Sequence, residues 1–245
     1  LSLHDALPIL EGIQFSIEEE EFVVLVGPSG CGKSTLLNIV GGLLSPTEGR
    51  VFFEGMKGKR EPNVGIVFQE IALFPWRTVY KNVVFGLEEK GIDTSEQQII
   101  AKKYIEMVGL NGFESAYPKQ LSGGMRQRVG IARALAIQPD LLLMDEPFSA
   151  LDAQTRTIMQ EELLDIWNQT RLSTLYVTHN IHEAVYLADR IIILSRRPGR
   201  IVKIVNIDLP KISRDREQYR ARFDEYVDHI WQLIRHDAQE AIKEG

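Results

Sequence analysis

The chain has 245 residues, of which 44% are hydrophobic and 25% charged, and its formal net charge at pH 7 is −6. It is long and apolar enough to bury a large core, either as one domain or as a core with a subdomain. The acidic balance argues against a nucleic-acid partner, and the basic runs at residues 57–60 and 196–200 are short enough to be solvated turns. No stretch reaches the ~18 consecutive apolar residues of a membrane-spanning helix. One cysteine, Cys31, cannot form an internal disulfide, which favours a reducing compartment.

The chain begins with the nine residues LSLHDALPI rather than with Met. This peptide is what one reading frame of a common sequencing adapter encodes. We therefore expect residues 1–9 to be non-native and leave them out of the functional interpretation.

The rest of the chain alternates apolar runs with helical periodicity, which predicts an α/β fold with a doubly wound, mostly parallel sheet. Buried strands are predicted near residues 22–26, 64–68, 141–144, 174–178 and 191–194. A smaller antiparallel layer is expected from residues 9–17, 50–54 and 201–207. Residues 70–139 are mostly helical, with amphipathic stretches at 95–108 and 122–137, and the tail from 211 to 245 has apolar residues at helical spacing.

A glycine-rich segment follows the first buried strand and fits the pattern G-x-x-x-x-G-K-[ST]. Its residues are Gly27, Pro28, Ser29, Gly30, Cys31, Gly32, Lys33, Ser34 and Thr35. The glycines permit a tight turn whose N–H groups point at the mouth of the helix that follows, a favourable place for phosphate oxygens. Lys33 would lie along the β- and γ-phosphates of a nucleotide, and the Ser34 hydroxyl would bind Mg²⁺. A glycine-rich turn without a ligand is the alternative, which the flanking strand and helix disfavour.

A second candidate phosphate contact lies at Ser122, Gly123 and Gly124. Ser122 is a good helix N-cap, and Met125 and Val129 follow at helical spacing. The serine hydroxyl and the glycine N–H groups would form an anion site at this helix N-terminus. An ordinary helix cap is the alternative.

Acidic residues also follow the predicted buried strand at residues 141–144, at the carboxyl end where open parallel sheets bind ligands. Asp145 would hold Mg²⁺ through water, and Glu146 is the candidate base that polarises the attacking water. The alternative is a polar strand exit. Gln69 and His179 end two other predicted strands, so that Gln69 could reach Mg²⁺ or the water and His179 the γ-phosphate. Taken singly, either could be ordinary surface.

These segments, in this order, resemble the nucleotide-binding subunit of an ATP-binding-cassette (ABC) transporter. Residues 121–125 are similar to the family signature, with Met125 in place of the usual Gln, and residues 149–152 resemble its D-loop, which ends at Asp152. The resemblance extends from about residue 10 to about 205. It implies an ATPase domain at residues 10–210, with a helical subdomain at about 70–139 and a helical extension at 211–245.

The resemblance also implies partners. Two copies would enclose two ATP molecules and Mg²⁺ head to tail, each copy's signature completing the other's site, on the cytoplasmic face of the inner membrane against integral permease subunits. A soluble ABC ATPase acting as an assembly scaffold, or in nucleic-acid or translation work, is the alternative. In this family an aromatic residue before the first strand stacks on adenine, and nothing aromatic precedes Phe15 here.

Three stretches are similar to importers of nitrate, taurine and alkanesulfonates, which also use a solute-binding protein. They are residues 73–76, 82–87 and 194–201. Trp76 would form part of a groove that receives a short helix of the permease, or it packs within the subdomain. The solute itself is not predicted, because this subunit would not touch it.

Overall fold

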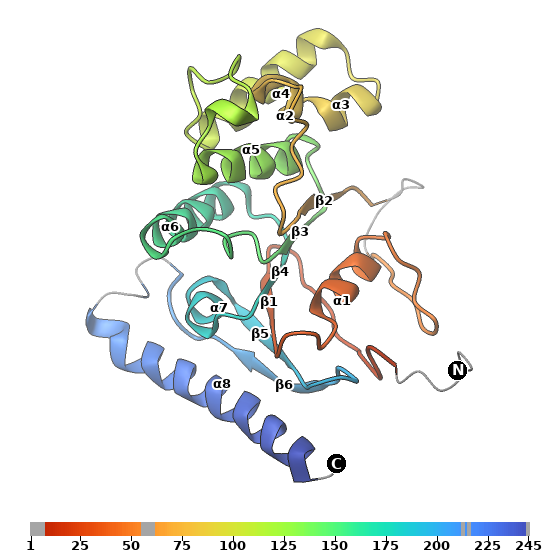
Figure 1. Ribbon diagram of the computed structural model, residues 1–245, viewed down its shortest axis with the longest axis vertical. Helices are drawn as coiled ribbons and strands as arrows, with labels where there is room; N and C mark the ends of the chain where they lie inside the picture. The colour runs from red at the N-terminus through yellow and green to blue at the C-terminus, as the bar shows by residue number, and fades with distance from the viewer. Residues whose placement is uncertain (1–7, 55–61, 212–213, 215–216, 244–245) are drawn as a thin grey trace. The chain divides into compact units, whose positions relative to one another are not determined.

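A computed structural model describes residues 8–54, 62–211, 214 and 217–243 (Figure 1). The seven residues 1–7 of the segment expected to be non-native therefore lie outside the described residues. The chain divides into two compact units, residues 1–52 with 173–245 and residues 53–172. Each unit is described by itself.

The first unit carries four strands in the order β4-β1-β5-β6. Its elements are β1 (Phe22–Val26), α1 (Lys33–Val40), β4 (Thr174–Thr178), α7 (Ile181–Leu187), β5 (Arg190–Leu194), β6 (Ile201–Asn206) and α8 (Glu217–Lys243). β1 pairs in parallel with β4 on one side and β5 on the other, whereas β6 runs antiparallel to β5. All five side chains of β1 are fully buried, because this central strand is covered on both faces.

The second unit pairs β2 (Val64–Val67) in parallel with β3 (Leu141–Asp145). Its helices are α2 (Val79–Val83), α3 (Phe85–Glu89), α4 (Thr94–Met107), α5 (Gly123–Ala136) and α6 (Ala153–Thr170), with a 3₁₀ turn at Pro118–Gln120. α5 packs against α2, α3 and α4 (Figure 1). These helices fall where the helical subdomain is expected, and the limits of that subdomain stay a prediction.

The small antiparallel layer is only partly as expected. β6 forms, but residues 9–17 contain only a bridge in which Leu10 pairs in parallel with Gly199, and residues 50–54 have no regular structure. Gly12 turns the first segment with a φ of 61°, which interrupts an extended run. Val51 and Phe52 are exposed, so no buried face fixes a strand in the second segment.

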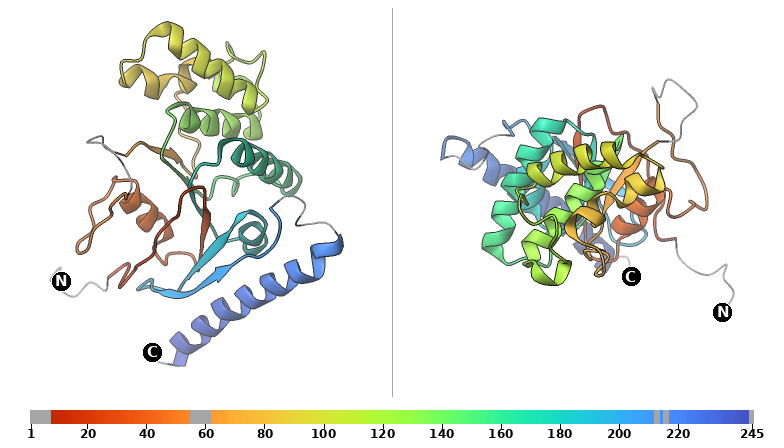
Figure 2. Two further views of the ribbon diagram at one scale, coloured as in Figure 1. Left: turned by 180° about the vertical axis from the view of Figure 1, so that it is seen from behind. Right: turned by 90° about the horizontal axis from the view of Figure 1, so that it is seen from above.

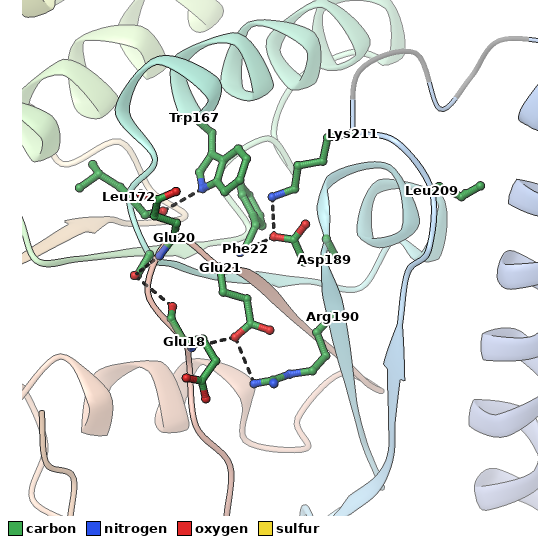
Figure 3. A network of polar contacts seen from close by, with 12 residues as sticks. Glu18, Glu20, Glu21, Phe22, Trp167, Leu172, Asp189, Arg190, Leu209 and Lys211 are labelled. Carbon is green, nitrogen blue, oxygen red and sulfur yellow. Dashed lines mark hydrogen bonds and ion pairs between the residues drawn. The ribbon is translucent and has the colours of Figure 1, made fainter. Parts of the chain in front are cut away.

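The C-terminal segment is tied to the rest of the first unit by charged side chains. The Lys211 ammonium lies 2.6 Å from the Asp189 carboxylate, which also accepts the backbone N–H of Phe22 at 2.8 Å (Figure 3). The Arg214 side chain is almost fully buried, and burial lowers its pKa to about 10. Beyond this anchor α8 lies against α7, β5 and β6 (Figures 1 and 2).

Arg214 satisfies a group of buried carbonyls that would otherwise lack donors. Its guanidinium donates to the carbonyl oxygens of Leu209, Val185, Tyr186 and Ala188 at 2.6–3.2 Å. Three of these carbonyls lie at the C-terminal end of α7, where helical carbonyls have no intrahelical partner. Arg214 therefore links the end of α7 to the segment that leads into α8.

We predict that Arg214→Met lowers the free energy of unfolding by about 3 kcal/mol, because several buried carbonyls lose a charged donor at once. Urea unfolding followed by circular dichroism measures this change. Arg222→Met is the matched control, since Arg222 is exposed and pairs with the exposed Asp208 at 3.1 Å, so that it should change stability little. Equal effects of the two substitutions would contradict the account.

Candidate functional site

The phosphate loop begins at the carboxyl end of β1 and leads directly into α1. Gly30 and Gly32 have φ values of 78° and 105°, in the left-handed region that other residues enter with strain. Gly32 is the N-cap of α1 and offers no side-chain cap to the first turn. The N–H groups of that turn therefore suit an anion that approaches the helix N-terminus.

Lys33 is held inside this loop. Its side chain is buried, and its ammonium donates to the carbonyl oxygens of Gly27 at 2.8 Å and Pro28 at 3.0 Å. An ammonium has three donors, so these two bonds fix its position and leave a third for a phosphate oxygen. Ser34, the predicted Mg²⁺ ligand, is the next residue and is exposed.

Neighbouring segments leave no space beside two of the loop glycines, Gly27 and Gly32, whereas Gly30 faces open space. A Cβ on Gly27 would lie 2.9 Å from the carbonyl oxygen of Leu194 at the end of β5, and a Cβ on Gly32 would lie 2.8 Å from Leu10. A Cβ on Gly199 would overlap the carbonyl oxygen of Cys31. The loop is thus enclosed by backbone as well as by side chains.

The segment at residues 196–200 is more than the solvated turn that the sequence predicts. Arg197 and Arg200 are exposed as expected, but Gly199 is buried against the phosphate loop. This contact is not predicted from the sequence. The Pro-Gly pair at 198–199 was the available signal, because such pairs mark tight turns where a backbone can approach another closely.

His179 lies at the same edge of the sheet as the phosphate loop. The register of β1 and β4 pairs Val26 with Thr178, so the residues that follow them, Gly27 and His179, leave neighbouring strands side by side. His179 is exposed. The structure therefore brings this predicted residue and the phosphate loop together.

In the second unit, Gln69, Asp145 and Glu146 are brought together at the carboxyl ends of β2 and β3. The register pairs Val67 with Met144, so Phe68 and Gln69 leave β2 at the edge where Asp145 and Glu146 follow Met144. The Gln69 amide donates to the Ser149 hydroxyl at 3.5 Å, and that hydroxyl donates to the backbone carbonyl of Glu146 at 2.9 Å.

Glu146 is also conformationally restrained. Its φ of 41° lies in the left-handed region, an uncommon backbone for a glutamate and one that is frequent at functional positions. The Ser149 N–H donates to the Glu146 carbonyl at 3.1 Å, in addition to the Ser149 hydroxyl. The turn after β3 is therefore held by two bonds to one carbonyl.

The predicted signature lies at the N-terminus of α5, against the beginning of α6. Ser122 caps α5 by accepting the Met125 N–H at 3.2 Å, and it remains exposed. A Cβ on Gly124 would lie 3.2 Å from the Thr155 methyl in the first turn of α6. Replacing the Gly124 hydrogen would therefore press on the neighbouring helix, whereas a Cβ on Gly123 would make only an ordinary 3.6 Å contact with Leu151.

Asp152 is the N-cap of α6. It accepts the Thr155 N–H at 3.0 Å and the Thr155 hydroxyl at 2.7 Å, and the backbone bond, followed by the hydroxyl bond, lowers the pKa of Asp152. Thr155 links Asp152 to Gly124, because its N–H and hydroxyl bond to the Asp152 carboxylate while its methyl lies beside Gly124. The second unit thus collects Ser122, Gly123, Gly124 and Asp152 at two adjoining helix N-termini.

Comparison with known proteins gives the family. The family model described as "ABC transporter" matches residues 10–149. The uncharacterized ABC transporter ATP-binding protein MJ0412 of Methanocaldococcus jannaschii is 53% identical over 235 residues, 96% of this chain and 87% of that protein. The aliphatic sulfonates import ATP-binding protein SsuB of Bacillus thuringiensis is 46% identical over 226 residues, 90% of this chain and 89% of that protein.

A solved structure agrees with these relatives. The dimeric, post-hydrolysis ATP-binding cassette MJ0796, bound to ADP and Pi, superposes with a TM-score of 0.70 at 34% identity, over 82% of this chain and 92% of that one. This chain belongs to the ABC transporter family, as one of its ATP-binding ATPase chains. Within residues 8–54, 62–211, 214 and 217–243, no helix has the length and hydropathy that crossing a bilayer requires.

We predict that Gly199→Ala weakens ATP binding about tenfold, because the added methyl overlaps the Cys31 carbonyl and displaces the phosphate loop. Calorimetric titration with Mg²⁺ and a non-hydrolysable ATP analogue measures the affinity. The control is Gly130→Ala in α5, where a Cβ would meet only the Ile71 methyl at an ordinary 3.8 Å. An unchanged affinity in Gly199→Ala would show that this contact does not shape the loop.

Proposed function

We propose that this chain binds and hydrolyses ATP to power an importer of a small solute of the nitrate, sulfonate or taurine class. The observation that carries the proposal is the buried Lys33, fixed by two carbonyls inside a glycine-lined loop at the edge where His179 also emerges. The likeness to a sulfonate import ATP-binding protein over nine-tenths of the chain supports the importer class.

The residues of the loop suit a triphosphate. The loop N–H groups and the third donor of Lys33 would bind phosphate oxygens, and the left-handed glycines allow the backbone to approach them closely. Ser34, Gln69 and Asp145 supply hydroxyl, amide and carboxylate oxygens, the ligand types that Mg²⁺ prefers. When bound, Mg²⁺ neutralises charge on the phosphates.

Hydrolysis in this proposal depends on two further side chains. Glu146 accepts a hydrogen bond from the attacking water and orients it, and its restrained backbone limits the directions in which the carboxylate can point. His179 contacts the γ-phosphate from the strand beside the phosphate loop. Phosphoryl transfer needs mainly such positioning and charge stabilisation from the protein.

A second copy of the chain would complete each site. Ser122, Gly123 and Gly124 present a hydroxyl and N–H groups at the N-terminus of α5, which suits the γ-phosphate held by the other copy. Asp152, beside them, would lie at the same junction between the two copies. The dimeric state of the related cassette MJ0796 supports a head-to-tail pair.

The same pair would work against integral permease subunits on the cytoplasmic face of the inner membrane, fed by a solute-binding protein. Trp76 is 72% exposed, and its ring lies 5.7 Å from that of Phe74. Phe74 in turn contacts Phe85 and lies under the guanidinium groups of Arg77 and Arg133. A rigid aromatic base with one exposed indole suits the docking of a permease helix.

We predict that Glu146→Gln keeps its affinity for ATP but hydrolyses it at least about 100-fold more slowly, because the amide cannot polarise the water. Lys33→Ala should instead weaken ATP binding about 10- to 100-fold, since it removes a charged donor to phosphate. Calorimetric affinities and steady-state phosphate release separate the two effects. Full turnover by Glu146→Gln would remove Glu146 from its assigned role.

Mixed dimers test the shared site. A Ser122→Arg chain should bind ATP in its own phosphate loop yet hydrolyse it poorly, and a Lys33→Ala chain should bind ATP only weakly. Of the three possible dimers of these chains, only the mixed dimer has an intact composite site. Partial activity should therefore return on mixing if one site can turn over alone. No recovery, with mixed dimers demonstrated by differently tagged chains, would count against sites shared between copies.

A further inference from the structure

A buried carboxylate lies beneath the loop that carries His179. Glu183, in the first turn of α7, is 5% exposed. Its carboxylate accepts the Tyr176 hydroxyl at 2.9 Å and the Thr178 hydroxyl through a second, shorter hydrogen bond. Both donors are buried residues of β4, so this carboxylate ties the start of α7 to the strand that precedes it.

The hydrogen bonds continue around His179. The Thr178 hydroxyl oxygen accepts the backbone N–H of Asn180 at 3.0 Å, and the Asn180 side-chain oxygen accepts the backbone N–H of Glu183 at 3.2 Å. A closed ring therefore runs from Glu183 through Thr178 and Asn180 back to Glu183. His179 is the one residue between Thr178 and Asn180, and it points out of the ring far enough to be exposed.

The chemistry of the carboxylate determines which group donates in each hydrogen bond of this ring. A carboxylate only accepts hydrogen bonds, so the Thr178 hydroxyl must donate its proton to Glu183. Its oxygen is then oriented to accept the Asn180 N–H. Bonds to a buried carboxylate are stronger than neutral ones, because the low local dielectric strengthens them and nothing else replaces them.

We propose that Glu183 is a positioning residue for His179 and acts through Thr178 and Asn180. The proposal rests on the proposed contact of His179 with the γ-phosphate. The buried carboxylate holds the Thr178 hydroxyl, and that hydroxyl holds the Asn180 N–H on the other side of His179. The imidazole therefore keeps its place beside the phosphate loop before ATP arrives. Loosening the ring leaves the phosphate loop itself intact, so it lowers the rate of hydrolysis more than the affinity for ATP.

Thr178→Val tests this most cleanly, because valine keeps the shape of threonine and removes only the hydroxyl that links Glu183 to Asn180. We expect kcat to fall about 10-fold or more with little change in KM for ATP. Thr178→Ser, which keeps the hydroxyl, should restore kcat. Glu183→Gln should lower kcat in the same way, and the threonine variants keep the test valid if that variant does not fold.

Tyr176→Phe is the matched control for the loss of one buried hydrogen bond to Glu183. It leaves the link from Thr178 to Asn180 in place, so it should lower the thermal midpoint about as much as Thr178→Val does while kcat stays close to that of the wild type. If Tyr176→Phe lowers kcat as strongly as Thr178→Val, the effect is one of general stability and the proposal is wrong.

A double-mutant cycle with His179→Ala separates positioning from a purely structural effect. If Thr178 acts through His179, Thr178→Val should have no further effect on kcat once His179 is alanine. An equal effect in both backgrounds would overturn the proposal. The proposal is also wrong if His179→Ala lowers kcat but Thr178→Val does not. An unaltered kcat in His179→Ala itself would refute the proposed role of His179 and the positioning role with it.

Discussion

The central strand β1 is the constraint on which the candidate site depends. It is buried at all five positions and paired on both sides, so the residues that follow it enter the edge of the sheet at a fixed place. Gly27 begins the phosphate loop there because the Leu194 carbonyl leaves no space for a Cβ. The loop then turns back so that Lys33 reaches the carbonyls of its own first residues. A buried ammonium with two fixed bonds is a preorganised phosphate donor.

Within each unit, the predicted site residues are held by similar means. In the first unit, hydrogen bonds hold the Thr178 hydroxyl and the Asn180 N–H on either side of His179, and the close approach of Gly199 to Cys31 restricts the backbone of the phosphate loop. In the second, Ser149 holds the carbonyl of Glu146, whose backbone lies in the left-handed region. Helix N-caps present Ser122 and Asp152. Predicted site residues on restrained backbones occur in each of the two units.

Much of the fold and of the candidate site follows from sequence because strong local patterns specify it. Continuous apolar runs predict β1 and β4 with their observed bounds, and the spacing of glycines with Lys33 predicts the loop. Long-range contacts are not encoded in this way. The approach of Gly199 to Cys31 and the carbonyls of α7 bound by Arg214 join residues far apart in the sequence, so periodicity and motif spacing do not reveal them. The ring around His179 is local in sequence, but it depends on how the end of β4 meets the start of α7, which periodicity does not specify.

In the proposed function, two copies of the chain close around ATP to form shared sites. Sedimentation equilibrium of the Glu146→Gln chain with and without Mg²⁺-ATP measures this directly. We predict the 27.8 kDa mass of one chain without nucleotide, and twice that mass with ATP, with one ATP retained per chain. A chain that stays at the single mass with ATP saturating its phosphate loop would contradict the claim.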